Sequence, residues 1–286
     1  MEFKLPIYLP VSKQTVSCRE LYNSDYFPIL KYLTTNNMAQ IGAAFEELIL
    51  ELSNKEVVYA FDKFVLLSTL RSIIIGDTIE IYNANKETLK YSISKIITDL
   101  SGVISTFTHD TKIFLDDLTL ELSLPTTLYF NNTEDVIKSS IINIIDNKKT
   151  IKYYLYNDEQ KEIFFDSLPA NILLKIQEHM SNIMSSTESL ELIPTNKLLN
   201  IEGIPCNLYS NILLEFLKII YSQDLMHFYE LQYNLTTKLN VSYSQFMDMT
   251  PAESKIFLNF YKKENKTAHS ENNKINLPVA PTYNDI

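Results

Sequence analysis

Glycine, arginine, cysteine and tryptophan are all scarce in this chain. The 286 residues include four glycines, two cysteines and no tryptophan, and the arginines are Arg19 and Arg71 alone. The glycines are too dispersed to form a phosphate-binding loop, which excludes the common nucleotide-binding motifs. Cys18 and Cys206 are too far apart in sequence for a C-x-x-C pair, so we expect neither a zinc ribbon nor a redox dithiol.

Long apolar runs and an excess of positive charge are also missing. No stretch approaches the roughly 18 uninterrupted apolar residues of a membrane helix. The opening MEFKLPIYLPVSK has no basic region followed by a long apolar run. The formal net charge is −10, whereas phosphate binding needs a positive patch. We therefore expect no membrane span, no targeting segment and no nucleic-acid partner.

The common enzyme signatures are absent as well. The sequence has no G-x-S-x-G elbow and no H-E-x-x-H zinc motif. The best candidate for a metal or acid–base cluster is His109-Asp110 followed by Asp116-Asp117. However, neighbouring residues of a strand point to opposite faces, and two acids in a turn are usually solvated. We therefore expect no enzyme activity, no metal and no cofactor.

The segment from Phe61 to Tyr82 is the most informative part of the chain. Its apolar residues form a wide helical face that ends at Ile74, and Asp62 lies in the first turn, where its charge favours the helix dipole. Gly76 can adopt the backbone conformation that ends a helix, and the residues after it alternate as in a strand. This pattern predicts a buried helix, a glycine stop and a strand.

Arg71 lies beside the apolar face of this predicted helix. A guanidinium that is nearly buried must be paired, and arginine supplies a planar fork of donors that lysine lacks. We expect Arg71 to be a structural anchor that binds backbone carbonyls or a carboxylate, either Asp62 or an acid from another element. The alternative is that codon usage spares arginine and that the two arginines have no special role.

Periodicity along the chain predicts an α+β fold, with helices plus short antiparallel hairpins followed by an all-helical C-terminal region. Hairpins are expected near residues 79–93, 112–124 and 190–204, and an Ile-rich helix is expected over residues 132–146. We divide the chain into three parts. They are an α+β domain over residues 1–204, a helical region over 205–264 and a disordered polar tail over 265–286.

The helical C-terminal region is rich in aromatic residues and methionine. Thr250 and Glu253 form a capping box around Pro251, which marks the start of the last helix. The aromatic residues and methionines are either ordinary core or a groove for a partner helix, a role that suits both residue types. The candidate partner-binding residues that we select are Tyr229, Tyr233, Phe246 and Met249.

Four short stretches, taken in their order along the chain, resemble a known protein family. They are VSCREL over residues 16–21, the helix with Asp62, Arg71 and Gly76, FFDSLP over 164–169, and MTPAE over 249–253. In this order they resemble the baseplate hub and tail assembly proteins of T-even-type contractile-tailed phages. Some members of that family carry C-x-x-C pairs at hairpin tips. The equivalent tips here, at residues 83–86 and 194–197, contain neither cysteine nor histidine.

The resemblance implies a protein that works by binding. It would help to build the baseplate hub or act as a chaperone of the tape-measure protein, in the host cytoplasm during assembly or in the virion baseplate. Its expected partners are tape-measure or baseplate hub proteins. The main alternative is a permanent structural subunit of the hub. A third hypothesis, from a different class, is a small phage enzyme that works through His109 and Asp116.

Overall fold

The computed structural model describes residues 4–82, 88–106, 111–115, 118–146, 149–195, 203–222 and 225–272, and side chains of the last helix as far as residue 263. The helices in these ranges are α1 (Asn23–Leu33), α2 (Met38–Leu52), α3 (Ala60–Ile74), α4 (Ile93–Ile104), α5 (Thr133–Ser139), the 3-10 helix η1 (Tyr153–Leu155), α6 (Asp158–Asp166), α7 (Ala170–Thr187), α8 (Ile212–Ser222), α9 (Leu225–Lys238), α10 (Tyr243–Met247) and α11 (Pro251–Asn272).

The strands of the described residues all pair with antiparallel neighbours. They are β1 (Lys4–Leu9), β2 (Gln14–Arg19), β3 (Thr78–Tyr82), β4 (Thr88–Ser92), β5 (Thr111–Leu115), β6 (Leu118–Leu122), β7 (Ile141–Asp146), β8 (Lys149–Lys152), β9 (Glu191–Ile193) and β10 (Ile204–Pro205). Strands β1–β2, β3–β4 and β9–β10 form hairpins, and β5-β6-β7-β8 form one meander. With α8 to α11 following, the predicted α+β class and the helical C-terminal region are confirmed.

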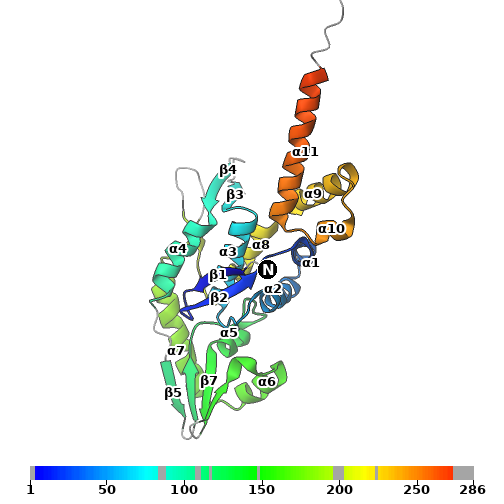
Figure 1. Cartoon of the computed structure of the whole chain (residues 1–286). Helices are drawn as coiled ribbons and strands as arrows, with labels where there is room; N and C mark the ends of the chain where they lie inside the picture. Colours follow the sequence, from blue (N-terminus) through cyan, green and yellow to red (C-terminus); the bar gives the residue numbers. More distant parts are fainter. Residues whose placement is uncertain are drawn as a thin grey trace, which may run out of the picture.

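Helix α3 lies at the centre of the body and is buried along most of its length (Figure 1). It packs against β1, α4 and α8. The Phe64 ring lies 5.9 Å from the ring of Phe216 on α8, and the Tyr221 hydroxyl donates to the Leu67 carbonyl at 2.9 Å. A helix that is apolar nearly all round needs neighbours on every side, and these elements supply them.

The predicted Ile-rich helix over residues 132–146 is wrong in its second half. Helix α5 ends at Ser139, and the isoleucines that follow form β7 between β6 and β8. Ile144 pairs with Leu120 of β6 and with Ile151 of β8, and it is buried. Isoleucine is β-branched and fits a pleated sheet, so the need for a central strand overrides the helical spacing.

Helices α4 and α6 were not predicted, although the sequence contains a start signal for each. The Ser92 hydroxyl accepts from the Lys95 amide at 3.1 Å and caps α4. Asn157 and Gln160 form a capping box at the start of α6. These are the ordinary N-terminal signals of helices. Helix α4 also has an apolar stripe of Ile93, Ile96, Leu100 and Ile104, all buried, whereas α6 is mostly polar and contains no buried residue.

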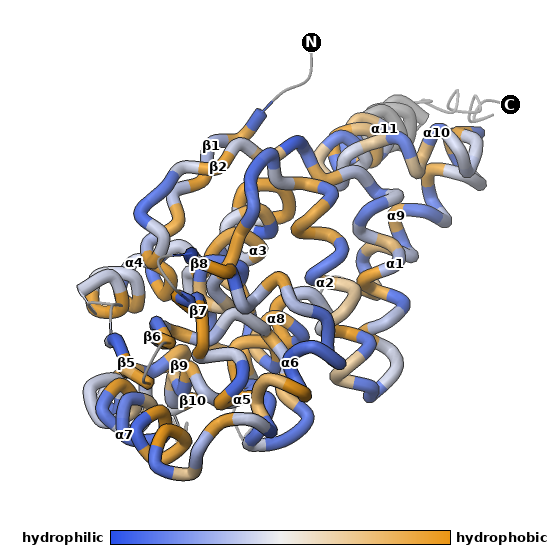
Figure 2. The backbone as a smooth tube through the Cα atoms, turned by 90° about the horizontal axis from the view of Figure 1, so that it is seen from below, coloured by the Kyte–Doolittle hydropathy of each residue, from blue (hydrophilic) through white to orange (hydrophobic). Residues whose placement is uncertain are grey.

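The C-terminal helices α9, α10 and α11 lie at one end of the molecule, whereas α7 and β5 lie at the other (Figures 1 and 2). Asn23 of α1 ties them to the body, because its side-chain amide donates to the Phe246 carbonyl at 2.7 Å and to the Ser254 hydroxyl at 2.8 Å. The Phe228 ring of α9 stacks on Phe27 at 5.7 Å. Buried residues from both regions belong to one core cluster.

Helix α11 projects away from the body (Figure 1). The sequence predicts a disordered tail from residue 265, but α11 continues to Asn272. Residues 273–286 lie outside the described part of the chain, and the division into three parts stays a prediction. Among the described residues, no helix has the combination of length and apolarity that crossing a bilayer requires.

Candidate partner-binding surface and polar pocket

Asp62 is fully buried in α3 and joins this helix to the N-terminal hairpin. Its Oδ1 accepts from the Val11 amide and its Oδ2 from the Ser12 amide, both at 2.9 Å. Burial raises the pKa of the Asp62 carboxyl above its usual range, and the hydrogen bonds from the hairpin act in the opposite direction. Asp62 therefore fixes the loop between β1 and β2 onto α3.

Arg71 is nearly buried at the other end of α3 and binds carbonyl oxygens. Its Nη1 donates to the Gly76 carbonyl and, at 3.3 Å, to the Thr78 carbonyl. Asp62 is nine residues away on the same helix, or about 13 Å along the axis, and its oxygens contact the hairpin instead. The predicted pairing of Arg71 with Asp62 is therefore wrong. The contacts of Arg71 agree with the other prediction, in which it binds backbone carbonyls.

Gly76 follows the end of α3 and has a φ of 145°, a conformation that favours glycine. Apart from Gly76 itself and its two neighbours in the chain, no heavy atom lies within 4 Å of the position that a Cβ would occupy. The backbone conformation, and not lack of space, therefore requires glycine here. Gly76 thus directs the chain from α3 into β3, as the sequence predicts.

Asp77 forms a hydrogen-bond network that was not predicted from the sequence. Its carboxylate accepts from the hydroxyls of Ser92 at 2.6 Å, Ser72 at 2.7 Å and Ser94 at 2.9 Å. Burial disfavours the charged form, but these hydrogen bonds outweigh it and lower the pKa of Asp77 to about 2. The network fastens the β3–β4 hairpin and the start of α4 to the end of α3.

One side of α9 exposes large side chains to solvent. Met226, Tyr229 and Tyr233 recur at helical spacing, and their exposed fractions are 78%, 42% and 62%. Phe228, Leu231 and Leu235 lie on the opposite side of the helix and are buried. The structure thus leaves two of the four candidate partner-binding residues, Tyr229 and Tyr233, accessible to a partner.

Phe246, a third candidate, is a core residue. It is fully buried in α10, and its ring lies 5.3 Å from the Phe228 ring. A partner cannot reach it, so its selection as a partner-binding residue is wrong. Met249 is partly buried, and its backbone carbonyl accepts a hydrogen bond from the backbone amide of Asn23 at 2.8 Å. Sequence alone cannot distinguish these residues from the α9 tyrosines, because all four lie in one segment that is rich in aromatic residues and methionine.

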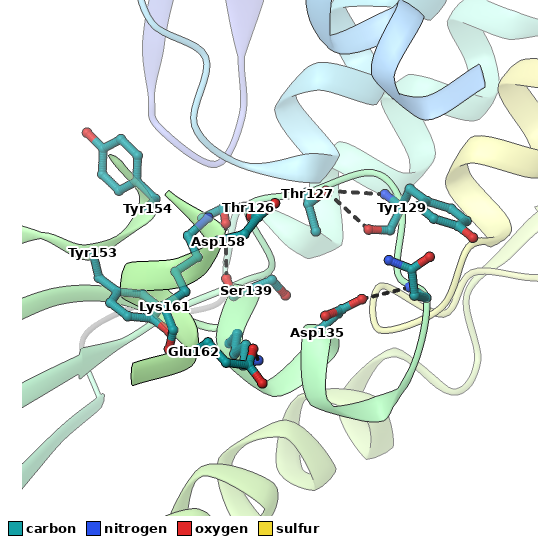
Figure 3. Close-up of a pocket in the computed structure, with 12 residues that line it drawn as sticks. Thr126, Thr127, Tyr129, Asp135, Ser139, Tyr153, Tyr154, Asp158, Lys161 and Glu162 are labelled. Atoms are coloured by element: carbon teal, nitrogen blue, oxygen red, sulfur yellow. Dashed lines mark hydrogen bonds and ion pairs between the residues drawn. The ribbon is translucent and has the colours of Figure 1, made fainter. Parts of the chain in front are cut away.

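A polar pocket of about 340 Å³ lies between the segment before α5, helix α5, η1 and α6. Lys161 and Tyr153 lie on one side of it, and Thr127, Tyr129 and Asp135 on the other (Figure 3). Burial lowers the pKa of Lys161, and its ammonium makes no hydrogen bond or close ion pair with the residues described. The lining contains hydroxyls, two lysine ammonium groups and three carboxylates, so the pocket is polar and carries both signs of charge.

Glu134, Glu162 and Asp166 lie close enough together to hold a metal ion. Lys138 already supplies the positive charge, since its ammonium binds Glu134 at 2.7 Å and also binds Glu162. The same ammonium lies 5.0 Å from the centre of the Phe165 ring. Two of these acids are thus paired with a lysine of the same chain, and their ion pairs join α5 to α6.

The two thiols and the His109 cluster offer no described site. Cys18 and Cys206 are buried free thiols, and burial raises their pKa values to about 11 and about 12. Neither is therefore a reactive thiolate at neutral pH. The predicted cluster of His109-Asp110 and Asp116-Asp117 lies outside the described residues.

Comparison with known proteins identifies the family. Residues 1–191 match the model of a family described as T4 bacteriophage base plate protein. No curated protein and no solved structure matches the chain. The match covers more than half of the sequence and includes β1 to β8 and α1 to α7, with Asp62, Arg71 and Gly76 among the matched residues. This chain therefore belongs to the T4 bacteriophage base plate protein family.

Proposed function

We propose that this baseplate protein acts as a chaperone in tail assembly and binds a helix of the tape-measure or hub protein through α9. The observation that carries the proposal is the exposed row of Met226, Tyr229 and Tyr233. The row lies on the side of α9 opposite the buried Phe228, Leu231 and Leu235, and its contact with the core is limited to the edge of the Tyr229 ring against Phe27 and Phe228. Tyrosine and methionine are residue types that commonly anchor partner helices.

Charge favours a basic partner helix. The chain has a formal net charge of −10, and Glu230 lies exposed beside the row on α9. An acidic chaperone attracts a basic partner and keeps the complex soluble. The row is therefore expected to bind the apolar stripe of a client helix, with basic residues of that helix flanking the stripe.

Co-purification from infected cells tests this proposal. A tagged chain with Tyr229→Ala and Tyr233→Ala should fold normally and lose the tape-measure or hub protein from its co-purified partners. Phe114→Ala is the matched control, since Phe114 is an exposed aromatic residue on β5, far from α9. If the double variant still co-purifies with its client, the tape-measure or hub protein, α9 is not the binding surface. The same conclusion follows if the Phe114→Ala control loses this client to the same extent.

A permanent structural subunit of the baseplate hub is the second candidate function, and the family description favours it directly. A subunit remains in the mature particle, whereas a chaperone leaves. Mass spectrometry of purified virions therefore separates the two roles. We expect the protein to be absent or far below one copy per baseplate, and stoichiometric retention would favour the subunit role.

An enzyme function through His109 and Asp116 is the least supported candidate, because the family description favours a structural or assembly role. Substitution of both residues by alanine should leave the yield of phage progeny unchanged. A collapse in yield with a normally folded protein would revive the enzyme hypothesis.

A further inference from the structure

The polar pocket beside α6 contains a cation that the described part of the chain leaves without a close partner. The ammonium of Lys161 makes neither a hydrogen bond nor a close ion pair with the residues described. Asp158 and Asp135 attract it from a longer distance, and Lys63 repels it. An ammonium that is partly buried and lacks an acceptor is unfavourable, so a ligand that brings an acceptor gains binding energy here.

Two other ammonium groups near this pocket are already paired within the chain. Lys138, which also lines the pocket, binds Glu134 and Glu162. Lys63 binds Glu46 at 2.7 Å. An anionic ligand would have to separate an existing ion pair to bind either of these groups, which is unfavourable. The ammonium of α6 is available to a ligand without that loss.

The charges of the lining favour a carboxylate over a phosphate. The two ammonium groups share the pocket with three carboxylates, so a doubly charged anion meets more repulsion than a singly charged one. Asp135 lies across the pocket from Lys161 (Figure 3). One of its oxygens accepts from the Asn131 amide at 2.9 Å, and the other makes no hydrogen bond with the residues described. That oxygen can accept from a hydrogen-bond donor of the ligand.

We propose that this pocket binds a carboxylate that is accompanied by a hydrogen-bond donor, with the carboxylate on Lys161 and the donor on Asp135. The volume of about 340 Å³ is at the small end of the range for ligand pockets and suits one amino acid or one side chain of a peptide. Free glutamate and a glutamate side chain of a partner protein share this chemistry. The first supplies an ammonium as the donor, and the second supplies backbone amides.

Ligand-observed NMR titrations of the purified full chain test the class of ligand. The probes are free glutamate, the capped peptide acetyl-Gly-Glu-Gly-amide and inorganic phosphate, each up to about 20 mM. At least one carboxylate probe should bind, and phosphate should bind more weakly. Tighter binding of free glutamate identifies a small-molecule ligand, and tighter binding of the peptide identifies an acidic side chain of a partner. Binding of neither carboxylate probe, or tighter binding of phosphate, overturns the proposal.

Two variants test the residues. Lys161→Met keeps the length of the side chain and removes its charge, so it should weaken binding of the carboxylate probe by about tenfold or more. Lys175→Met, at an exposed position of α7, is the matched control and should bind as the wild type does. Equal affinities of these two variants overturn the proposal. Asp135→Asn keeps an acceptor for the Asn131 amide and should weaken the same probe by a smaller factor, and unchanged binding overturns the role of Asp135.

Thermal unfolding separates loss of the site from loss of the fold. The midpoint of Lys161→Met should not fall below that of the wild type, because an ammonium without a close acceptor does not stabilise the body. A large drop in midpoint would show that this ammonium has an acceptor within the chain and would overturn the proposal. Helices α5 and α6 lie away from α9 (Figure 1), so these results do not depend on client binding through α9.

Discussion

The exposed large apolar side chains are distributed differently in the body around α3 and in the C-terminal helices. In the body, Phe45, Phe61 and Phe64 are fully buried, and the exposed apolar residues, such as Tyr8 and Phe114, are scattered. In α9 and α11 the exposed ones recur at helical spacing beside a buried stripe. Scattered exposure is normal for a soluble surface, whereas a repeated stripe points to a partner.

The family match sharpens this contrast, because residues 1–191 end before α8. The matched region contains the buried Asp62 and Arg71 with their contacts to the β1–β2 loop and to the residues after α3, and the exposed stripes of α9 and α11 lie beyond it. On the proposed function, the exposed surface that binds the client lies in the C-terminal helices, which also have buried residues in the common core. The predictions below test this contrast, and the first three compare a variant with a matched control variant.

The largest expected effect comes from Phe246→Ala, which removes a buried ring from the core of the C-terminal helices. Loss of a buried phenylalanine costs about 3–5 kcal/mol. Tyr243→Ala is the control because Tyr243 lies on the same short helix and is half exposed. Urea titration should show a large drop in midpoint for the first variant alone. Equal midpoints would mean that α10 does not pack as described.

Asp62→Ala is expected to destabilise the body by about 3 kcal/mol, because two amides of the β1–β2 loop lose a charged acceptor. Asp99→Ala, on an exposed position of α4, should be nearly neutral. Thermal unfolding of both variants measures the difference. If Asp62→Ala and Asp99→Ala unfold at the same temperature, the two amides of the β1–β2 loop must find other acceptors.

Arg71→Lys is expected to cost about 1–3 kcal/mol, since it keeps the charge and loses the fork that reaches two carbonyls. Arg19→Lys should cost less, because Arg19 pairs with Asp25 at a more exposed position, where ion pairs contribute little. The urea midpoint is the measurement. An unchanged midpoint for Arg71→Lys would show that the carbonyl contacts are dispensable.

Asp77 should make the body sensitive to acid. Its folded pKa of about 2 lies below the unfolded value of about 3.9, so its stabilising contribution is present above about pH 4 and is lost as the pH falls toward 2. The gap in unfolding free energy between wild type and Asp77→Asn should therefore shrink over this range. Urea titrations at several acidic pH values measure it. A gap independent of pH would contradict the depressed pKa.

The smallest expected effect on stability is that of Tyr233→Ala. Tyr233 is 62% exposed on α9, and surface substitutions usually change stability by less than about 0.5 kcal/mol. Its thermal midpoint should match the wild type even where client binding is lost. A clear drop in the thermal midpoint would show that Tyr233 packs in a core. The difference in side-chain exposure between the body and the C-terminal helices would then no longer hold.

Local patterns in the sequence were sufficient where neighbours along the chain determine the structure. The buried helix that ends before Gly76, the strand after it and the capping box of Thr250 and Glu253 all occur as predicted. Each depends on a glycine conformation, a helical stripe or hydrogen bonds within one turn. These forces act over a few residues, so the sequence contains all their partners.

Contacts between distant segments required the tertiary structure. Residues 141–146 are spaced for a helix, but they form β7 because β6 and β8 lie on either side. Phe246 and Tyr233 have similar sequence surroundings, yet one contacts Phe228 and the other faces solvent. Asp62 contacts a loop about 50 residues away in sequence. Burial depends on which elements meet, and residue type and spacing alone do not determine this.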